Sequence, residues 1–333
     1  MTRVVLAYSG GAETSAAIPW LAHNPPASAP DGIEIVAVIL DLGRRAELVE
    51  LRERALALGA VRCHVVDVRE VLAGAYVLPA LQAGVFTDAR GSMTADIARP
   101  LVAKTLVDVA RMEDAGVVAY GGSAGQHRAP LDALVASLNP ELQRVAVPPA
   151  RTAEEISANL WGRCVACAPD ANVSEDAYVL TQSADGSPNR PAYLELEFQS
   201  GVPSRVNGIE MPLLEMIESL EIIGGTHGIG RTDAIVERAD GSKWREIGEA
   251  PAARLLQLAQ QEIQTLMLSA ELSRPMEKAG CEYADLIRSG GWFSPAREAL
   301  DAVIATIQPE LTGSIRLRLF KGDCHAVPAL VNS

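Results

Sequence analysis

The feature that most constrains this chain lies near its N-terminus, where an apolar run leads directly into the letters YSGGAETS and then a helical pattern. A turn of this kind directs several backbone N–H groups toward one point, beside the positive end of a helix dipole. Gly10 and Gly11 allow a ligand to approach the backbone closely, while Ser9, Thr14 and Ser15 add hydroxyl donors. The phrase therefore predicts a loop that binds a phosphate or diphosphate.

Apolar runs alternate with helical patterns through the first half of the chain. We expect strands at residues 4–7, 33–40, 63–66, 117–119 and 144–147, and helices at 14–22, 46–58, 71–83 and 97–115. This alternation predicts an α/β fold with a doubly wound parallel sheet, which binds ligands at the carboxyl ends of its strands. Asp41 and Gly43 follow the second strand, so we expect them at that edge beside the loop that follows the first strand.

The pattern changes after Pro148 and Pro149, which indicate a domain exit. We expect a nucleotide-binding domain at 1–155 and a second, α+β domain at 156–333. In the second domain we expect a loop-rich stretch at 165–191, strands at 193–198 and 315–319, and helices at 212–220, 251–272 and 295–307. The alternation at 315–319 is typical of a half-exposed antiparallel strand.

Charge and hydropathy exclude several classes of partner. The 333 residues carry a formal net charge of −13, which argues against a broad nucleic-acid surface. No stretch approaches the roughly 18 apolar residues of a membrane span, and the N-terminus has no signal-peptide pattern. We expect a cytoplasmic protein that acts on small molecules, with neither nucleic acid nor membrane as a partner.

The five cysteines are an odd number, so they cannot all form disulfides within one chain. Cys164 and Cys167 form a Cys-x-x-Cys motif, which occurs in redox pairs and as half of some metal sites. No second pair completes four ligands. We expect reduced thiols.

The phosphate loop resembles that of the N-type ATP pyrophosphatases, and further phrases resemble one family within that group, the argininosuccinate synthases. Eight phrases follow that family in order: AYSGG with TS, DLG, ARPLVAK, NLWGR, GGTHGIGR, EAP, GWFSP with REALD, and TG to KG. The resemblance implies a Rossmann-like domain and a synthetase domain. It also implies an ATP-dependent C–N ligase in which a carbonyl oxygen attacks the α-phosphate, pyrophosphate leaves, and an amine displaces AMP.

The resemblance also implies site residues. ATP would be held by Ala7, Tyr8, Ser9, Gly10, Gly11, Thr14 and Ser15, with Asp41 and Gly43 beside the adenosine. Glu13 and Arg99 would be catalytic residues, and Glu13 would also be the carboxylate on the Mg²⁺ side. Glu249 matches the acidic residue that contacts the amino group of the acceptor. The glycines around His227 indicate a tight structural loop.

Several positions depart from the family pattern. Glu13 stands where the family has Asp, and Mg²⁺ tolerates little misplacement of its ligands. The substrate loop reads GGSAGQHRAP, without the Lys and the Asn-Asp pair of the family. Cys164 replaces a serine, a helix before NLWG is deleted, and no C-terminal arm follows. We therefore expect a homo-oligomer that is a dimer and not an arm-exchanged tetramer.

The rewritten loop predicts a changed pair of amino-acid-like substrates. Gly121, Ser123, Gln126 and Cys164 are the candidate substrate contacts, and His127 and Arg128 are candidate catalytic residues. Three alternatives stay open at this point. The chain could be a genuine argininosuccinate synthase, a sulfur-transfer enzyme that uses Cys164 and Cys167, or a non-catalytic nucleotide-binding paralogue.

Overall fold

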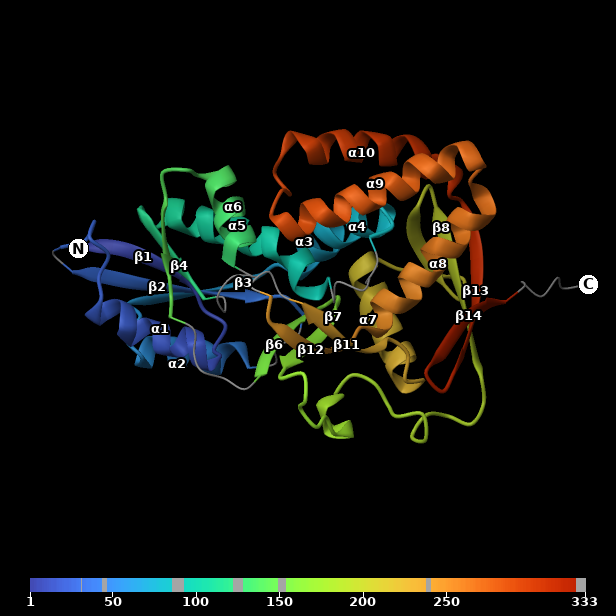
Figure 1. Cartoon of the computed structure of the whole chain (residues 1–333), viewed down its shortest axis with the longest axis horizontal. Coiled ribbons are helices and arrows are strands. Elements are labelled where there is room, and N and C mark those ends of the chain that lie inside the picture. The colour runs from blue at the N-terminus through green and yellow to red at the C-terminus, as the bar shows by residue number, and fades with distance from the viewer. Residues whose placement is uncertain are drawn as a thin grey trace, which may run out of the picture.

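The computed structural model describes residues 1–30, 32–43, 47–85, 93–121, 128–148, 154–237 and 241–327. Of residues 128 and 154 it describes the backbone alone. The first part of the chain forms a five-stranded parallel sheet (Figure 1), with the strand order β3-β2-β1-β4-β5. Its strands are β1 (Thr2–Ala7), β2 (Ile33–Asp41), β3 (Arg62–Asp67), β4 (Val117–Tyr120) and β5 (Gln143–Ala146). All five lie within two residues of the predicted ranges.

Both faces of this sheet are covered, which is why its strands read as continuous apolar runs. Val4 and Leu6 pack with helices α1 (Ala12–His23) and α2 (Leu48–Ala57) on one face. Val5 packs on the other face, in the cluster that contains the apolar side of helix α5 (Thr94–Met112). Helix α6 (Arg128–Leu138) lies against α5. The predicted doubly wound architecture is confirmed.

A run of short helical segments follows β3. It consists of α3 (Arg69–Leu72), a π-helical turn η1 (Ala73–Val77) and α4 (Leu78–Gln82). These segments are continuous with one another and cover most of the single helix predicted at 71–83. Pro79 stands at the start of α4, where the missing N–H does not interrupt a helix.

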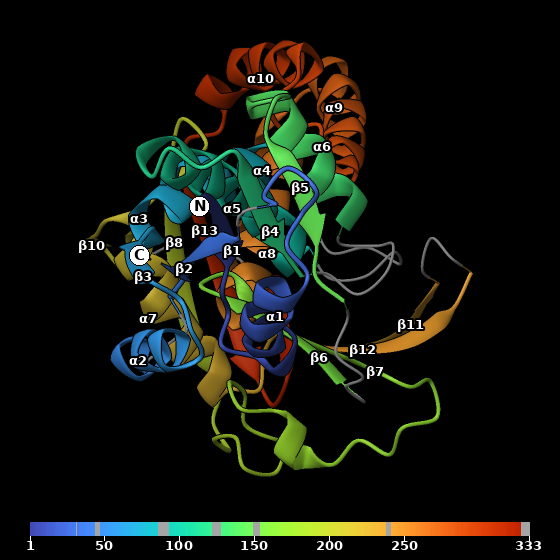
Figure 2. The same ribbon diagram turned by 90° about the vertical axis from the view of Figure 1, so that its left-hand side faces the viewer.

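The second part of the chain is an α+β domain with two antiparallel sheets. One sheet has the order β11-β12-β7-β6, from β6 (Glu154–Asn159), β7 (Gly162–Cys167), β11 (Arg231–Glu237) and β12 (Lys243–Glu249). The other has the order β10-β9-β8-β13-β14, from β8 (Ala192–Gln199), β9 (Val202–Val206), β10 (Ile209–Glu210), β13 (Gly313–Phe320) and β14 (Asp323–Val327). Figure 2 shows β11 and β12 extending away from the helices.

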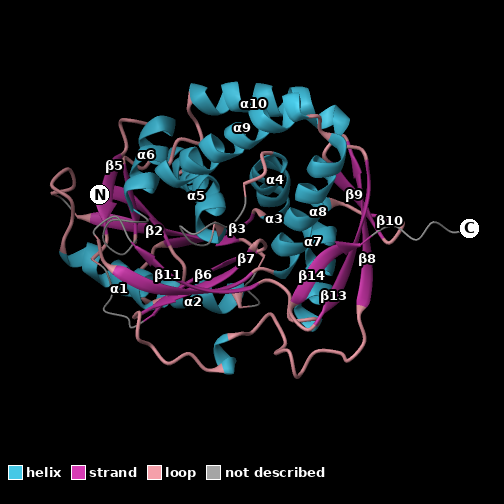
Figure 3. Cartoon of the chain, turned by 45° about the vertical axis from the view of Figure 1, so that its right-hand side comes forward, coloured by secondary structure: helices cyan, strands magenta, loops and turns pink. Residues whose placement is uncertain are grey.

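Helices fill the space between these sheets and continue along one side of the molecule (Figure 3). They are α7 (Leu213–Thr226), α8 (Pro251–Met267), α9 (Ala270–Ser289) and α10 (Pro295–Ile307), with short 3₁₀ turns at Glu175–Ala177 and Gln308–Glu310. The single helix predicted at 251–272 was wrong, because Leu268 is extended and ends α8. The predicted loop-rich stretch at 165–191 was wrong at its start, since Cys167 ends strand β7.

The two parts meet at the carboxyl edge of the parallel sheet. Leu160 N–H donates to Leu42 O at 2.6 Å, and α5 contacts both β6 and β7. The predicted domain boundary at 155 lies next to residues outside the described ranges and stays a prediction. Within those ranges, no helix is long and apolar enough to cross a membrane.

Candidate active site

The strand order β3-β2-β1-β4-β5 places the topological switch point between β1 and β4, where doubly wound sheets bind ligands. A pocket of about 290 Å³ lies there. Its lining comes from strands β1, β2, β4 and β6, from the phosphate loop, and from helices α1, α5 and α6. The lining residues are Ala7, Tyr8, Ser9, Glu13, Thr14, Val38, Leu40, Leu42, Ala95, Arg99, Val102, Tyr120, Gly121, Leu131 and Ser157. Its lining is apolar along β2, at Val38 and Leu40, and polar at the phosphate loop and the start of α1, at Ser9, Glu13 and Thr14, a mixture that suits a nucleotide.

The phosphate loop has the backbone that its glycines predict. Gly10 has φ of +76°, a conformation that residues with a Cβ rarely adopt. A Cβ at this position would lie 2.2 Å from Cδ2 of Leu51, so α2 packs directly on the loop. Gly11 is the exposed N-cap of α1 and is extended, with φ of −69° and ψ of 170°. The N–H groups of the first turn of α1 therefore lie at the polar end of the pocket.

Hydroxyl groups hold this loop in shape. Thr14 Oγ1 lies 3.1 Å from Ser9 Oγ and accepts the Ser9 N–H at 3.2 Å. Ser15 Oγ lies 3.2 Å from the Tyr8 hydroxyl and donates to Gly10 O at 3.4 Å. These contacts preorganise the turn before a ligand arrives, which reduces the ordering cost of binding.

Glu13 reaches across the pocket to the end of β4. A Cβ on Gly121 would lie 2.7 Å from both Cδ and Oε2 of Glu13. The carboxylate therefore rests against the Gly121 backbone, in space that only glycine leaves open. Glu13 has one methylene more than the Asp of the family, and the space beside Gly121 accommodates it. Among the described residues that line the pocket, Glu13 is the one with a carboxylate.

Arg99 contributes a buried cation to the same pocket, with 7% of its surface exposed. It lies on α5 and forms an ion pair with Asp96 one turn earlier. Asp96 is also 4.0 Å from Nε of Arg288 on α9. The second domain therefore helps to hold the carboxylate that positions Arg99.

Tyr120 lines the pocket but was not among the site residues predicted from the sequence. Tyr120 is 2% exposed, and its hydroxyl donates to a carboxylate oxygen of Asp132 on α6. This bond ties the end of β4 to α6, on either side of the substrate loop. A polar-tipped aromatic residue at the end of the fourth strand is the signal that could have indicated it.

The predicted adenosine contacts, Asp41 and Gly43, are not lining residues of the pocket but flank Leu42, which is one. Asp41 Oδ1 accepts the Gly43 N–H at 2.9 Å, and Oδ2 lies 3.5 Å from Nε of Arg69. Gly43 has φ of +96° and packs on Leu160 of the second domain. Leu42 between them lines the pocket. Asp41 and Gly43 thus shape the turn that presents Leu42.

The rewritten substrate loop falls mostly outside the described residues. Gly121 is described and lines the pocket. Ser123, Gln126 and His127 lie outside the described ranges, as does the side chain of Arg128, whose backbone begins α6. Their predicted roles stay predictions.

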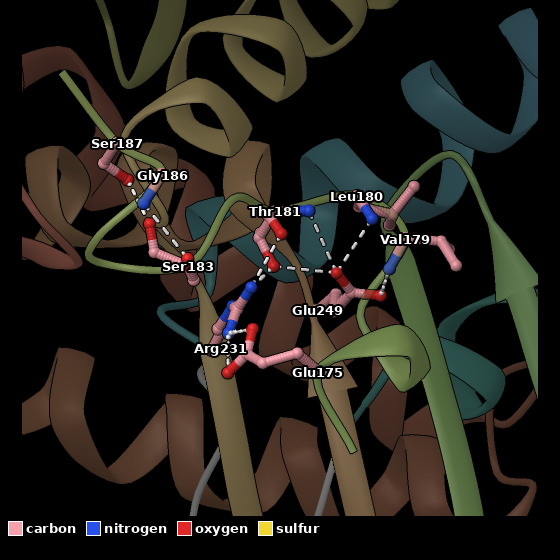
Figure 4. Close-up of polar contacts among 9 residues, drawn as sticks. All are labelled: Glu175, Val179, Leu180, Thr181, Ser183, Gly186, Ser187, Arg231 and Glu249. Carbon is pink, nitrogen blue, oxygen red and sulfur yellow. Dashed lines mark hydrogen bonds and ion pairs between the residues drawn. The ribbon is translucent and has the colours of Figure 1, made fainter.

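The carboxylate of Glu249, the predicted contact for the amino group of the acceptor, binds the protein itself in this structure (Figure 4). The side chain is 1% exposed. Oε1 accepts the N–H groups of Leu180 and Thr181 at 2.8 and 3.0 Å and the Thr181 hydroxyl at 2.7 Å. Oε2 accepts the Val179 N–H at 2.9 Å and lies 3.3 Å from Nη1 of Arg163. Glu249 is therefore an internal clamp for the loop at 179–181. The sequence does not indicate this role, because Glu249 and Val179 are 70 residues apart along the chain.

Arg231 completes this cluster. Its Nε donates to Thr181 Oγ1 at 2.8 Å, Nη2 donates to Thr181 O at 2.7 Å, and Nη1 lies 2.9 Å from Oε2 of Glu175. The guanidinium also stacks on the Tyr178 ring, 4.0 Å from its centroid. The arginine that ends the GGTHGIGR phrase thus holds the same loop as Glu249.

The glycines of that phrase are structural, as expected. A Cβ on Gly225 would lie 2.2 Å from Leu180 O, and one on Gly230 would lie 2.6 Å from the Ala250 backbone. His227 is 8% exposed at the end of α7, and burial lowers its pKa. His227 is therefore a packed residue at the end of α7.

The two cysteines of the Cys-x-x-Cys motif cannot act as a pair. Both are buried in strand β7, where residues three apart point to opposite faces. Their Cα atoms are about 10 Å apart at the rise of a strand, whereas a disulfide needs about 7 Å or less. Cys167 donates to Arg245 O at 3.6 Å. The sulfur-transfer alternative therefore loses its structural basis, and Cys164 is a residue of the sheet.

Comparison with known proteins agrees with this geometry. The family model of the arginosuccinate synthase N-terminal HUP domain matches residues 3–161, and that of the arginosuccinate synthase C-terminal domain matches residues 155–328. The argininosuccinate synthases of Bacillus thuringiensis (strain Al Hakam) and Bacillus cereus (strain 03BB102) are each 36% identical to this chain over 355 residues. Those residues cover 98% of this chain and 86% of each relative. The chain belongs to the argininosuccinate synthase family of ATP-dependent ligases.

Proposed function

We propose that this chain is an AMP-forming C–N ligase whose substrates differ from citrulline plus aspartate. A carbonyl oxygen of the acceptor attacks the α-phosphate of ATP, the bond to the β-phosphate breaks, and pyrophosphate leaves. An amine then attacks the activated carbon and AMP leaves with the C–O bonding electrons. The observation that carries the proposal is the pocket at the switch point, which joins the phosphate loop to a buried arginine.

The residues of the pocket fit a nucleotide with its metal ion. Val38, Leu40 and Leu42 form an apolar wall suited to a purine. At the other end the exposed N-cap at Gly11 leaves the loop open to the triphosphate. Glu13 supplies a hard oxygen ligand, which is the kind that Mg²⁺ prefers. When bound, Mg²⁺ would neutralise phosphate charge and orient the leaving pyrophosphate.

The catalytic work of the protein is positioning and charge stabilisation, as in other phosphoryl transfers. The loop N–H groups and the hydroxyls of Ser9, Thr14 and Ser15 bind the outer phosphates. Arg99, fixed by Asp96, faces the charge that develops during transfer. Because Arg99 is buried, its charge acts through a less polar medium than water.

Two observations support a changed acceptor. The carboxylate of Glu249, expected on the amino group of the acceptor, is occupied inside the protein. Cys164 replaces a serine contact and is buried in β7. Each hydrogen bond lost to a charged or buried group costs about 1–3 kcal/mol of binding. These losses favour an acceptor that is recognised by other groups, with Gly121, Ser123 and Gln126 as the candidate contacts and His127 and Arg128 as the candidate catalytic pair.

The test separates the two half-reactions. Exchange of labelled pyrophosphate into ATP, measured with each ureido, amide or carboxylate compound in the absence of amine, identifies the acceptor. AMP release with a panel of amines then identifies the nucleophile. Citrulline with aspartate is included as the reference pair, and Arg99→Gln serves as the impaired variant.

The outcomes are distinct. Exchange with a compound other than citrulline supports the proposal in full. Efficient turnover of citrulline and aspartate refutes the changed substrates and makes the chain a genuine argininosuccinate synthase. ATP binding with neither exchange nor AMP formation would indicate a non-catalytic paralogue.

A further inference from the structure

Helix α2 lies directly against the phosphate loop, although it comes from a separate part of the chain. Leu51 occupies the space that a side chain on Gly10 would need, with its Cδ2 2.2 Å from the position of that Cβ. Arg54 follows three residues later and therefore lies on the same face of the helix. Its Nη1 donates to Gly10 O at 3.4 Å. The packing of Leu51 thus holds a guanidinium at the tip of the loop.

The charge of Arg54 is not neutralised in the structure. Arg54 is exposed, and within the described part of the chain it forms no ion pair. Its hydrogen bond to a neutral carbonyl is long and leaves most of its N–H donors for another acceptor. Two other described cations near this edge, Arg69 and Arg99, are each paired with an aspartate. Arg54 is therefore a described cation that can turn toward an added anion at low cost.

A triphosphate bound at the phosphate loop needs a cation such as the Arg54 guanidinium at the tip of the loop. The N-terminus of a helix supplies the equivalent of about half a positive charge, which is small against the charge of the β- and γ-phosphates. Glu13, the nearest carboxylate of the loop, is directed to Gly121 on the other side. An arginine binds phosphate oxygens with two parallel N–H groups and adds orientation as well as charge.

We propose that Arg54 is a phosphate-binding residue that completes the loop from the side of α2 and contacts the β- or γ-phosphate of ATP and the pyrophosphate product. This inference rests on the proposed use of ATP at the same loop. It places Arg54 at the two outer phosphates of ATP, which leave together as pyrophosphate. Arg54 therefore contributes to the affinity for ATP and pyrophosphate and contributes nothing to the affinity for AMP.

Helix α2 offers a matched control in Arg52. This residue is also exposed and lies about 200° around the helix from Arg54. Its charge acts on the Cys63 thiol, whose pKa it lowers against the larger upward effect of burial. Arg52→Gln therefore removes the same charge from the same helix without touching the loop.

The experiment measures binding of ATP, pyrophosphate and AMP to the full chain by titration calorimetry. Arg54→Gln is expected to weaken ATP and pyrophosphate about tenfold or more, as for a hydrogen bond to a charged group, and to leave AMP within twofold. Arg54→Lys keeps the charge but lacks the two parallel N–H groups of arginine. Its affinities for ATP and pyrophosphate should lie between those of Arg54→Gln and the wild type. Arg52→Gln should match the wild type for all three ligands.

Two results would overturn the assignment. One is unchanged binding of ATP and pyrophosphate by Arg54→Gln. The other is an equal loss for AMP, which would indicate a general distortion of the site. If the wild-type chain bound no ATP, the proposed function itself would fail, and that result is separate from either outcome.

Discussion

Replacing Glu249 with alanine should destabilise the protein strongly, because this carboxylate is an internal clamp. The substitution removes the acceptor for three backbone N–H groups, for the Thr181 hydroxyl and for Arg163. Hydrogen bonds to a charged acceptor contribute about 1.5–3 kcal/mol each, and removing one partner of a buried ion pair costs about 3–5 kcal/mol. Val179 is exposed, so its N–H can regain a water molecule. We therefore expect a loss near the lower limit, about 3 kcal/mol.

This loss is measurable as a shift of the thermal unfolding midpoint. At about 2–4 °C per kcal/mol for a unit of 150–250 residues, Glu249→Ala should unfold roughly 6–12 °C below the wild type. Circular dichroism follows the transition, and limited proteolysis should show faster cleavage near residues 175–185. Glu237→Ala is the control, because Glu237 is exposed in the same sheet. It should stay within about 0.5 kcal/mol of the wild type.

The opposite pattern would refute the reasoning. If Glu249 bound the acceptor and did not hold the loop, Glu249→Ala would have the same thermal unfolding midpoint as the wild type. It would then have a higher KM for the acceptor. Glu249→Gln adds a second test, since its NH₂ group would face the N–H of Val179 and the guanidinium of Arg163. A clamp predicts that Glu249→Gln is also destabilised, by less than the alanine variant.

Three further predictions concern other parts of the chain. Gly121→Ala should weaken ATP binding because its Cβ meets Glu13, and Glu13→Asp should relieve part of that loss, with a coupling energy of about 0.5–3 kcal/mol in a double-mutant cycle. Burial raises the pKa of the Glu113 carboxyl. Hydrogen bonds and charges from Arg62 and His64 outweigh this effect and hold the pKa below its ordinary value. The unfolding free energy of the wild type should therefore exceed that of Glu113→Gln most at pH 7, and the difference should shrink as pH falls below about 4; a difference that grows toward low pH would contradict this. A thiol reagent should react rapidly with exposed Cys281 alone, since burial raises the pKa of Cys324 to about 12, and Cys281→Ser should abolish the fast phase.

Some parts of the fold are predictable from short stretches of sequence. The parallel strands are buried on both faces, so each appears as an unbroken apolar run, and Gly10 with Gly11 identifies the loop through local backbone geometry. Strand β7 was missed because its pattern is interrupted by glycine, arginine and cysteine. Its place in the centre of a sheet depends on partners at 154–159 and 243–249.

The sequence by itself determined the parallel α/β domain, the phosphate loop and the family, because these depend on periodicity and on the order of short motifs. Tertiary structure alone decided what individual polar residues do. Glu249 has the same letter whether it binds a substrate or a loop, and its role follows from the donors brought to it by residues 179–181. Arg54 likewise acquires its place at the loop only because Leu51 packs on Gly10. Contacts between segments far apart in the chain are set by packing, and no local pattern records them.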